Sequence, residues 1–310
     1  MQVPAEARSL SFHDAVFAAA LGKRPQWLYV RQFEAPIATR PMQASTTIRP
    51  AAVAGLFYAA EAGVLAADVR GYLEQARGHA ASTDGIPKAV IVPHAGFVYS
   101  GITAAQAYIR LAAARGAIER VVLLGPTHRV PVRGVAVPAA SEYETPLGKV
   151  AIDRDAIAAL RDLPQIRESD AVHAWEHSLE VQLPFLQTVL SDFKLVPLAV
   201  GDATAEEVEQ VIDRLWGGPE TLIVVSSDLS HYHSYVEARR IDQETVQHIM
   251  ELAPILDYGQ ACGAMPINGL LLCARYRELR PGLLDLRNSG DTAGDKLRVV
   301  GYASFAFTPV

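Results

Sequence analysis

The 310-residue chain lacks the features that define several specialised classes of protein. Its two cysteines are too few for a disulfide framework, so we expect a protein of the reducing cytoplasm. No apolar run reaches the roughly 20 residues that a membrane-spanning helix needs. The apolar stretch Ala15–Leu21 follows acidic Asp14 and precedes Lys23 and Arg24, which is the wrong order of charge for a secretory signal.

The chain also has no excess of positive charge. Lys and Arg number 28 against 34 Asp and Glu, which gives a formal net charge of −6. A broad basic surface is therefore not expected, and nucleic acid is excluded as a predicted partner. Half of the residues are hydrophobic and 20% are charged, as in ordinary globular proteins, and the length is sufficient for a sizeable core.

The first 41 residues differ in pattern from the rest of the chain. They contain a short amphipathic piece around Phe12–Leu21, the run Trp27–Val30 and a loose stretch that ends at Pro41. Met42 then begins a segment that looks like a natural start. We expect residues 1–41 to be a poorly ordered extension or an over-extended start, with an N-terminal arm that contacts a partner as the alternative.

Strand-like and helical segments alternate from Ile48 onward. The predicted strands are Lys88–Val92, Arg120–Leu124, Gly134–Pro138, Lys149–Ile152, Leu195–Val200, Thr221–Ser226 and Val299–Phe307. The predicted helices are 64–77, Ile102–Ala114, Asp153–Arg161, Trp175–Leu190, Ala205–Trp216, 237–251 and 264–277. This alternation, without a repeat or a low-complexity linker, predicts a single α/β domain over residues 42–310. Its architecture should be three-layer α/β/α with a mostly parallel central sheet.

Four short polar clusters follow apolar runs or open a helix. His94, His128 and the Asp228–His231 segment each come directly after a predicted strand, and Cys262 precedes the helix over 264–277. The carboxyl ends of strands in an open α/β sheet converge on one crevice, so these side chains should meet there. Imidazole is the commonest metal ligand, and a thiolate at a helix start is a good soft ligand. The clusters therefore predict a metal site.

Each of these residues also has a purely structural interpretation. His94 and His128 could be loop histidines that bond to the backbone, and Ser227 or Asp228 could be the N-cap of a following helix. The functional interpretation makes Asp228 a ligand or a supporting partner and His231 an acid or base. Cys273 lies in an apolar helical stretch and is expected to be a buried small hydrophobe.

The segment Glu176–Glu180 begins a predicted helix. His177 and Glu180 are three residues apart and so share a helix face, but they do not form the two-histidine motif of zinc proteases. One interpretation is a solvated, acidic first turn. The other is a layer around the metal ligands, in which His177 and Glu180 orient ligands or substrate.

Six motifs, in order along the chain, resemble the Memo family, whose prokaryotic members are called AmmeMemoRadiSam system protein B. They are Val92–Gly101, Gly125–His128, Tyr143–Gly148, Glu176–Glu180, Ser226–His231 and Cys262–Ile267, in which Cys262-Gly263 is followed after two residues by Pro266-Ile267. The opening Arg49–Tyr58 is also similar to the usual N-terminus of that family. The resemblance runs from about Ile48 to Phe307 and leaves residues 1–41 outside it.

The family is similar in fold to class III extradiol ring-cleavage dioxygenases, which bind Fe(II) with two His and a Glu beside a catalytic His. By this resemblance His94 and His128 are the two His ligands and Cys262 stands where the carboxylate ligand would be. Asp228 and His231 fall on the acidic and His positions of the site and are the predicted catalytic residues. A thiolate is softer than a carboxylate and can itself be oxidised. The resemblance thus implies a transition metal, with iron or copper ahead of zinc, and leaves ring cleavage in doubt.

Three functions remain open on the sequence. The first is a metal-dependent, redox-linked oxidoreductase, and the second is a non-catalytic metal carrier or metal-gated binding module. The third is a hydrolase that uses Ser226 or Ser227 with His231 and Asp228, but no G-x-S-x-G elbow supports it. The resemblance also implies a radical SAM protein and an AMMECR-type protein as partners. A small molecule or a peptide is expected as ligand, and no membrane association is expected.

We predict that residues 1–41 are dispensable, because they lie outside both the alternating pattern and the family motifs. A chain that begins at Met42 should keep the melting temperature and metal content of the full chain. A melting temperature lower by several degrees, which corresponds to about 1 kcal/mol or more, would show instead that Phe12–Val30 packs on the core.

Overall fold

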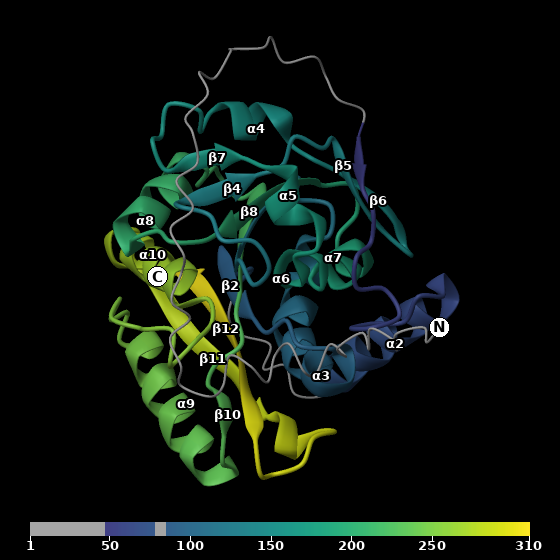
Figure 1. Ribbon diagram of the computed structural model, residues 1–310, viewed down its shortest axis with the longest axis vertical. Coiled ribbons are helices and arrows are strands. Elements are labelled where there is room, and N and C mark those ends of the chain that lie inside the picture. Colours follow the sequence, from purple (N-terminus) through teal and green to yellow (C-terminus); the bar gives the residue numbers. More distant parts are fainter. Residues whose placement is uncertain (1–46, 78–84) are drawn as a thin grey trace, which may run out of the picture. The chain divides into compact units, whose positions relative to one another are not determined.

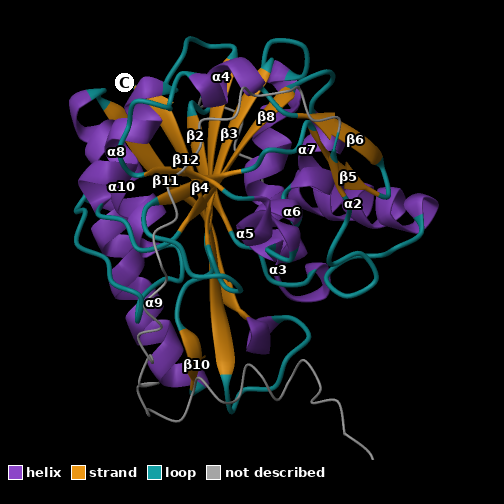
Figure 2. Ribbon diagram, turned by 45° about the horizontal axis from the view of Figure 1, so that its top comes forward, coloured by secondary structure: helices purple, strands orange, loops and turns teal. Residues whose placement is uncertain are grey.

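The computed structural model describes residues 47–77 and 85–310, and the predicted extension over 1–41 lies outside them. A nine-stranded sheet runs between two layers of helices (Figures 1 and 2). A second, three-stranded sheet contains β1 (Ile48–Arg49), β5 (Glu142–Thr145) and β6 (Gly148–Ala151). Within the described residues, no helix combines the length and apolar character that crossing a bilayer requires.

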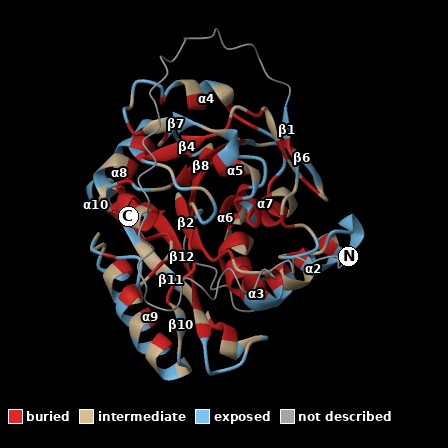
Figure 3. Ribbon diagram, in the orientation of Figure 1, coloured by how far each residue is buried: buried red, intermediate tan, exposed pale blue. Residues whose placement is uncertain are grey.

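The large sheet has a parallel centre and antiparallel flanks. Its strands are β2 (Ala89–Val92), β3 (Arg120–Pro126), β4 (Val135–Val137), β7 (Ile166–Glu168), β8 (Lys194–Val200), β9 (Thr221–Ser226), β10 (His231–His233), β11 (Leu279–Asn288) and β12 (Val299–Pro309). Their order is β10-β12-β2-β9-β3-β8-β4-β7, with β11 also paired to β12. The adjacent strands β2, β9, β3 and β8 are parallel. They are buried almost throughout, which explains their continuous apolar runs (Figure 3).

Helices cover both faces of this sheet. One layer contains α2 (Ala62–Arg77), α3 (Phe97–Tyr108) with the 3₁₀ helix η1 (Ile109–Ala114), α6 (His177–Glu180) and α7 (Leu183–Val189). The other contains α8 (Ala205–Arg214), α9 (Tyr235–Met250) and α10 (Ala264–Tyr276), and Figure 2 shows the two groups on opposite sides of the strands. The short helices α4 (Arg154–Ala158), α5 (Asp170–Ala174) and η2 (Ser289–Asp291) lie in connections. The predicted three-layer α/β/α architecture with a mostly parallel central sheet is therefore confirmed.

Some predicted elements differ from those observed. The helix predicted over Trp175–Leu190 is divided into α6 and α7, with Pro184 in the first turn of α7, where its missing amide hydrogen costs least. Strand β11 was not predicted, because Pro281 and Gly282 in its sequence are typical of a turn. It is stabilised by a long antiparallel pairing with β12, which a local pattern does not reveal.

The strand register brings three loops together at the carboxyl ends of the parallel strands. Val92 at the end of β2 pairs with Ser226 at the end of β9, and β9 pairs in parallel with β3. Three candidate site residues, His94, His128 and Asp228, therefore each lie two residues beyond the end of one of these adjacent strands. The parallel centre of the sheet is what positions the site.

A buried ion pair joins the start of the described domain to α6. The Arg49 guanidinium contacts the carboxylate of Glu180, and both residues are buried. Arg49 also donates to the carbonyl oxygens of His173 (3.0 Å) and Glu176 (2.7 Å).

The Glu180 carboxylate accepts further hydrogen bonds from the Tyr58 hydroxyl at 2.5 Å and from the Ala52 and Val53 amides at 2.8 and 3.0 Å. All of these contacts fix the short helix α6, which on its own would be too short to persist. The alternative of a solvated first turn for Glu180 is therefore wrong.

We predict that Glu180→Ala destabilises the fold by about 3–5 kcal/mol, because it leaves the Arg49 charge buried without its partner. Urea unfolding followed by circular dichroism measures the loss. The matched control is Glu244→Ala, which removes an exposed carboxylate paired with Arg240 and should leave the midpoint almost unchanged. Equal effects of the two substitutions would contradict this account of α6.

Candidate metal centre

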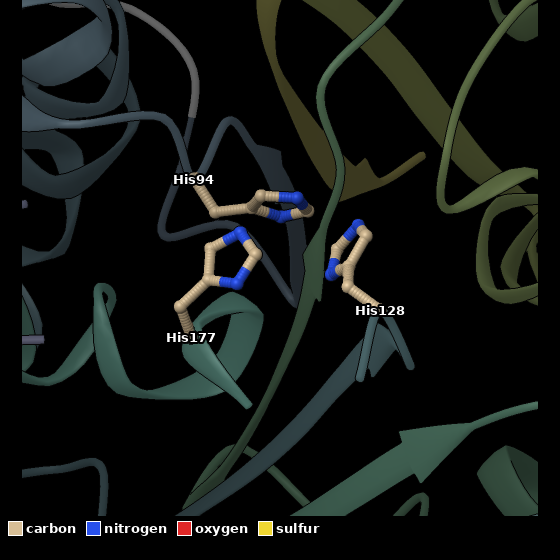
Figure 4. A group of neighbouring side chains, drawn as sticks. All are labelled: His94, His128 and His177. Carbon is tan, nitrogen blue, oxygen red and sulfur yellow. The ribbon is translucent and has the colours of Figure 1, made fainter. Parts of the chain in front are cut away.

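Three imidazoles converge from three different parts of the chain (Figure 4). His94 follows β2, His128 follows β3, and His177 is the first residue of α6. Each offers one ring nitrogen, and these atoms all lie within 4.8 Å of one another. The ring centroids of His128 and His177 are 4.6 Å apart, and those of His94 and His128 are 5.2 Å apart. Imidazoles grouped in this way are a characteristic metal-binding arrangement.

His177 is part of the histidine cluster, whereas the sequence predicted only a supporting role for it. It was expected to support the ligands, but its ring packs against both His94 and His128 and belongs to the cluster itself. Burial, together with the charges of His128 and His94, holds the pKa of His177 well below its ordinary value. Its Nδ1 is buried and lies 3.4 Å from a Glu176 carboxylate oxygen, although the geometry is not that of a hydrogen bond. A neutral imidazole with an available ring nitrogen is the form that binds a metal ion.

Gly125 allows α6 to approach the end of β3 closely enough for His177 to reach the histidine cluster. A Cβ at position 125 would lie 2.8 Å from the Ser178 hydroxyl and 3.0 Å from Leu179, both of which belong to α6. The Ser178 hydroxyl instead donates a 2.8 Å hydrogen bond to the Pro126 carbonyl oxygen. The close contact between glycine and helix thus places His177 beside the strand-end histidines.

Glu176 orients His128, and sequence reasoning missed this role. Its carboxylate accepts hydrogen bonds from the His128 backbone amide at 2.5 Å and from the ring Nδ1 at 2.9 Å. Burial raises the pKa of Glu176, but the hydrogen bond and charge of His128 outweigh it and hold that pKa well below the usual range. With Nδ1 bonded to a carboxylate, Nε2 of His128 is the nitrogen left for a metal. The only signal in the sequence was the position of Glu176 next to His177.

Cys262 lies against the histidine cluster. Its sulfur is 3.4 Å from Nε2 of His94 and 3.6 Å from the Asp228 carbonyl oxygen. Although burial raises the pKa of the Cys262 thiol, its interactions with His94 and His128 lower it to about 6. Burial in turn opposes protonation of His128, but its hydrogen bonds to Cys262 and Glu176 raise its pKa to about 10.

Asp228 holds the loop that carries His94. Its carboxylate accepts a 2.7 Å hydrogen bond from the His94 amide and is almost completely buried, and burial raises its pKa. The alternative in which Ser227 or Asp228 caps a helix is wrong, because the chain continues into strand β10. Helix α9 begins only at Tyr235, with Ser234 as its N-cap.

His231 begins strand β10 and interacts electrostatically with Asp228. Burial lowers the pKa of its imidazole, and the Asp228 carboxylate only partly opposes this effect. The next residue, Tyr232, has a left-handed backbone with φ of 62° at an irregularity in the pairing of β10 with β12. Such backbone is uncommon for a residue other than glycine and is found often at functional sites. His231 is therefore a neutral imidazole beside a buried carboxylate.

The two serines proposed as hydrolase nucleophiles have their hydroxyl hydrogens committed elsewhere. Ser226 donates to the Ser178 carbonyl oxygen at 2.6 Å, and Ser227 donates to the Asp228 carbonyl oxygen at 2.8 Å. Neither hydroxyl is bonded to His231 in these contacts, and both serines are fully buried. This geometry does not support the hydrolase alternative.

A cavity of about 740 Å³ lies at the opposite end of the sheet. It is lined by residues at the starts of β9 and β11, together with Lys88, Trp216 and Arg277. None of the clustered histidines lines it, so the candidate metal centre and this cavity are separate features.

We predict that Glu176→Gln weakens metal binding by about 10- to 100-fold, because the His128 ring loses the carboxylate that orients it. Calorimetric titration of the metal-free protein with Zn²⁺ measures the affinity. Glu209→Gln, which changes a carboxylate on α8 bonded to Tyr276, is the matched control and should leave the affinity unchanged. An unchanged Zn²⁺ affinity in Glu176→Gln would show that His128 does not bind the metal.

Residues 49–306 match the family described as Memo-like protein. The chain is 37% identical over 287 residues to a MEMO1 family protein of Ignicoccus hospitalis, covering 84% of this chain and 98% of the relative. It is 36% identical over 233 residues to one of Aquifex aeolicus, covering 71% and 86%. An uncharacterized protein from Escherichia coli K12 shares 13% identity and a TM-score of 0.45, over 70% of this chain and 98% of that one. The resemblance inferred from the motifs is confirmed, and the chain belongs to the Memo-like protein family.

Proposed function

We propose that this protein binds a transition-metal ion through His94, His128 and His177, with Cys262 as an adjacent thiolate ligand, and that the site is redox-linked. The observation that carries the proposal is the convergence of three ring nitrogens within 4.8 Å of one another. His94 is buried within this group, and burial and the neighbouring imidazoles hold the pKa of His177 well below its ordinary value, which favours the neutral, metal-binding form of its ring.

The position of Cys262 fits a shared ion. Metal–nitrogen bonds of about 2.0–2.1 Å and a metal–sulfur bond of about 2.3 Å place the N and S ligands of a tetrahedral ion about 3.5 Å apart. The Cys262 sulfur is 3.4 Å from Nε2 of His94. A set of nitrogen donors with one thiolate suits copper, zinc or iron rather than magnesium or calcium. We favour iron or copper, because a thiolate donates charge that stabilises an oxidised metal ion.

Asp228 and His231 are proposed as the groups that hold and move protons beside this site. His231 is neutral at physiological pH because burial lowers its pKa, so it can accept a proton. Asp228 fixes the His94 loop and supplies the negative charge that would stabilise a protonated His231. A bound metal ion would contribute electron transfer and Lewis acidity, while these two residues supply acid–base function.

A non-catalytic metal carrier is the second candidate, and one observation favours it. The sequence predicted three ligands, His94, His128 and Cys262, whereas the clustered ring nitrogens are those of His94, His128 and His177, and the Cys262 sulfur lies 3.4 Å from Nε2 of His94. Four protein ligands close a tetrahedral site, whereas catalytic sites keep a position open for water or substrate. The two functions therefore differ in whether three or four of these side chains bind the ion.

We predict that the wild-type protein, reconstituted without oxygen, binds one equivalent of Fe(II) or Cu(I). Separate substitutions of His94, His128, His177 and Cys262 by Ala should each lower the bound metal. His248→Ala is the control, because that imidazole lies on α9 and contacts Gln260 instead. Metal content is measured by elemental analysis, and circular dichroism confirms folding. Wild-type stoichiometry in the triple variant of His94, His128 and Cys262 would locate the ion elsewhere.

The same samples separate the two functions. A redox-linked site should consume oxygen when the reduced, iron-loaded protein is exposed to it, and Cys262→Ala should change the rate. A carrier should instead release its ion to a chelator and consume no oxygen. Catechol is expected to be turned over slowly or not at all, because the thiolate replaces the carboxylate ligand of ring-cleaving enzymes. Rapid formation of a yellow ring-opened product would contradict this expectation.

A further inference from the structure

A buried chain of hydrogen bonds lies behind His94. It runs from Tyr108 at the end of α3, through Gln182 before α7, to Ser226 at the end of β9. Ser226 then meets Nδ1 of His94 at 2.9 Å. Tyr108, Gln182 and Ser226 are at most 1% exposed, so water does not compete for their hydrogen bonds. The direction of every bond in the chain follows from counting donors and acceptors.

Gln182 has a defined orientation. One end of its amide lies 2.9 Å from the Pro93 carbonyl oxygen and 2.8 Å from the Ser226 hydroxyl. A carbonyl oxygen only accepts hydrogen bonds, so the atom facing Pro93 must be the NH₂ group. The amide oxygen is then at the other end, where it accepts a 2.8 Å bond from the Tyr108 hydroxyl. The Gln182 amide group therefore donates to Ser226.

The Ser226 hydroxyl has a single hydrogen to donate, and that hydrogen bonds to the Ser178 backbone. Its hydroxyl lies 2.6 Å from the Ser178 carbonyl oxygen, which again only accepts. The Ser226 oxygen therefore accepts both from Gln182 and from the ring of His94. Nδ1 of His94 must carry a hydrogen to make this bond, and in the neutral ring Nε2 is left with a free lone pair. That Nε2 is the atom 3.4 Å from the Cys262 sulfur.

We propose that Ser226 and Gln182 are positioning residues that hold His94 in the Nδ1–H tautomer and aim its Nε2 lone pair at the metal centre. The benefit for metal binding rests on the proposed function, whereas the tautomer does not. The two strand-end histidines are thereby oriented in different ways. A carboxylate, Glu176, bonds Nδ1 of His128, whereas a neutral hydroxyl bonds Nδ1 of His94. His94 is the less electron-rich donor of the two.

The tautomer is tested by nitrogen-15 NMR of the histidine side chains in the metal-free protein at mildly alkaline pH. In the wild type, His94 should show a protonated Nδ1 and an unprotonated Nε2. In Ser226→Ala the ring loses its acceptor, and a share of the Nε2–H tautomer should appear. Gln182→Met keeps Ser226 as the acceptor and should have a smaller effect. A wild-type His94 that is protonated at Nε2, alone or at both nitrogens, would overturn the proposal.

A matched control separates this role from general packing. Ser304→Ala removes another buried serine hydroxyl, one that makes no hydrogen bond, and should leave the His94 signals unchanged. Ser226→Thr restores a hydroxyl and should restore the wild-type tautomer. If the Ser226→Ala variant fails to fold, Gln182→Met and the wild-type spectrum still decide the outcome. A wild-type tautomer in a folded Ser226→Ala variant would show that Ser226 does not fix it.

Zn²⁺ affinity provides the second readout and is measured on the same variants. Ser226→Ala should bind Zn²⁺ about 10-fold more weakly, because its His94 ring is no longer fixed in the binding tautomer. If wild-type protein shows the predicted tautomer but binds no Zn²⁺, Fe(II) or Cu(I), the proposed function fails while the assignment of the tautomer stands. An unchanged Zn²⁺ affinity in a variant with an altered tautomer would remove the link to metal binding.

Discussion

The parallel pairing of β2, β9 and β3 is the constraint on which the rest of this structure depends. Parallel strands in register end at the same level of the sheet, and here a candidate site residue lies two positions beyond the end of each strand. The backbone hydrogen bonds of the sheet therefore set the separation of His94, His128 and Asp228 before any side chain contributes. Helices on both faces exclude water from these strands, and the strand-end loops carry the polar groups.

Two buried carboxylates stabilise the site, because hydrogen bonds and an ion pair offset the free-energy cost of burying their charge. Glu176 and Glu180 are both buried, and each is surrounded by donors: the His128 ring and amide for Glu176, and Arg49, Tyr58 and two amides for Glu180. Because α6 has only four residues, these bonds rather than helix propensity determine its position. The same bonds place His177 within the cluster and orient His128, so the geometry of the candidate metal centre depends on the contacts that stabilise α6.

The chemistry of the proposed metal centre would depend on the contrast between its ligands. Glu176 would make His128 an electron-rich donor, the Ser226 hydroxyl would make His94 a weaker one, and Cys262 would add a polarisable thiolate. If all four side chains bind one ion, the site is closed, as in carriers and structural centres. If one of them stays free, the ion keeps a position for an exogenous ligand beside His231 and Asp228. Membership of the Memo-like family is compatible with either function.

Much of the fold was determined by local patterns in the sequence. Continuous apolar runs identified the buried parallel strands, and loop histidines after two of them indicated a metal site with Cys262 nearby. Partnerships between residues far apart in the chain were decided only by tertiary structure. Strand β11 depends on its pairing with β12, and His177 joins the cluster because Gly125 admits α6 beside β3. The roles of Glu176 and Ser226 arise from hydrogen bonds across 48 and 132 residues of sequence, and no local pattern records contacts at such separations.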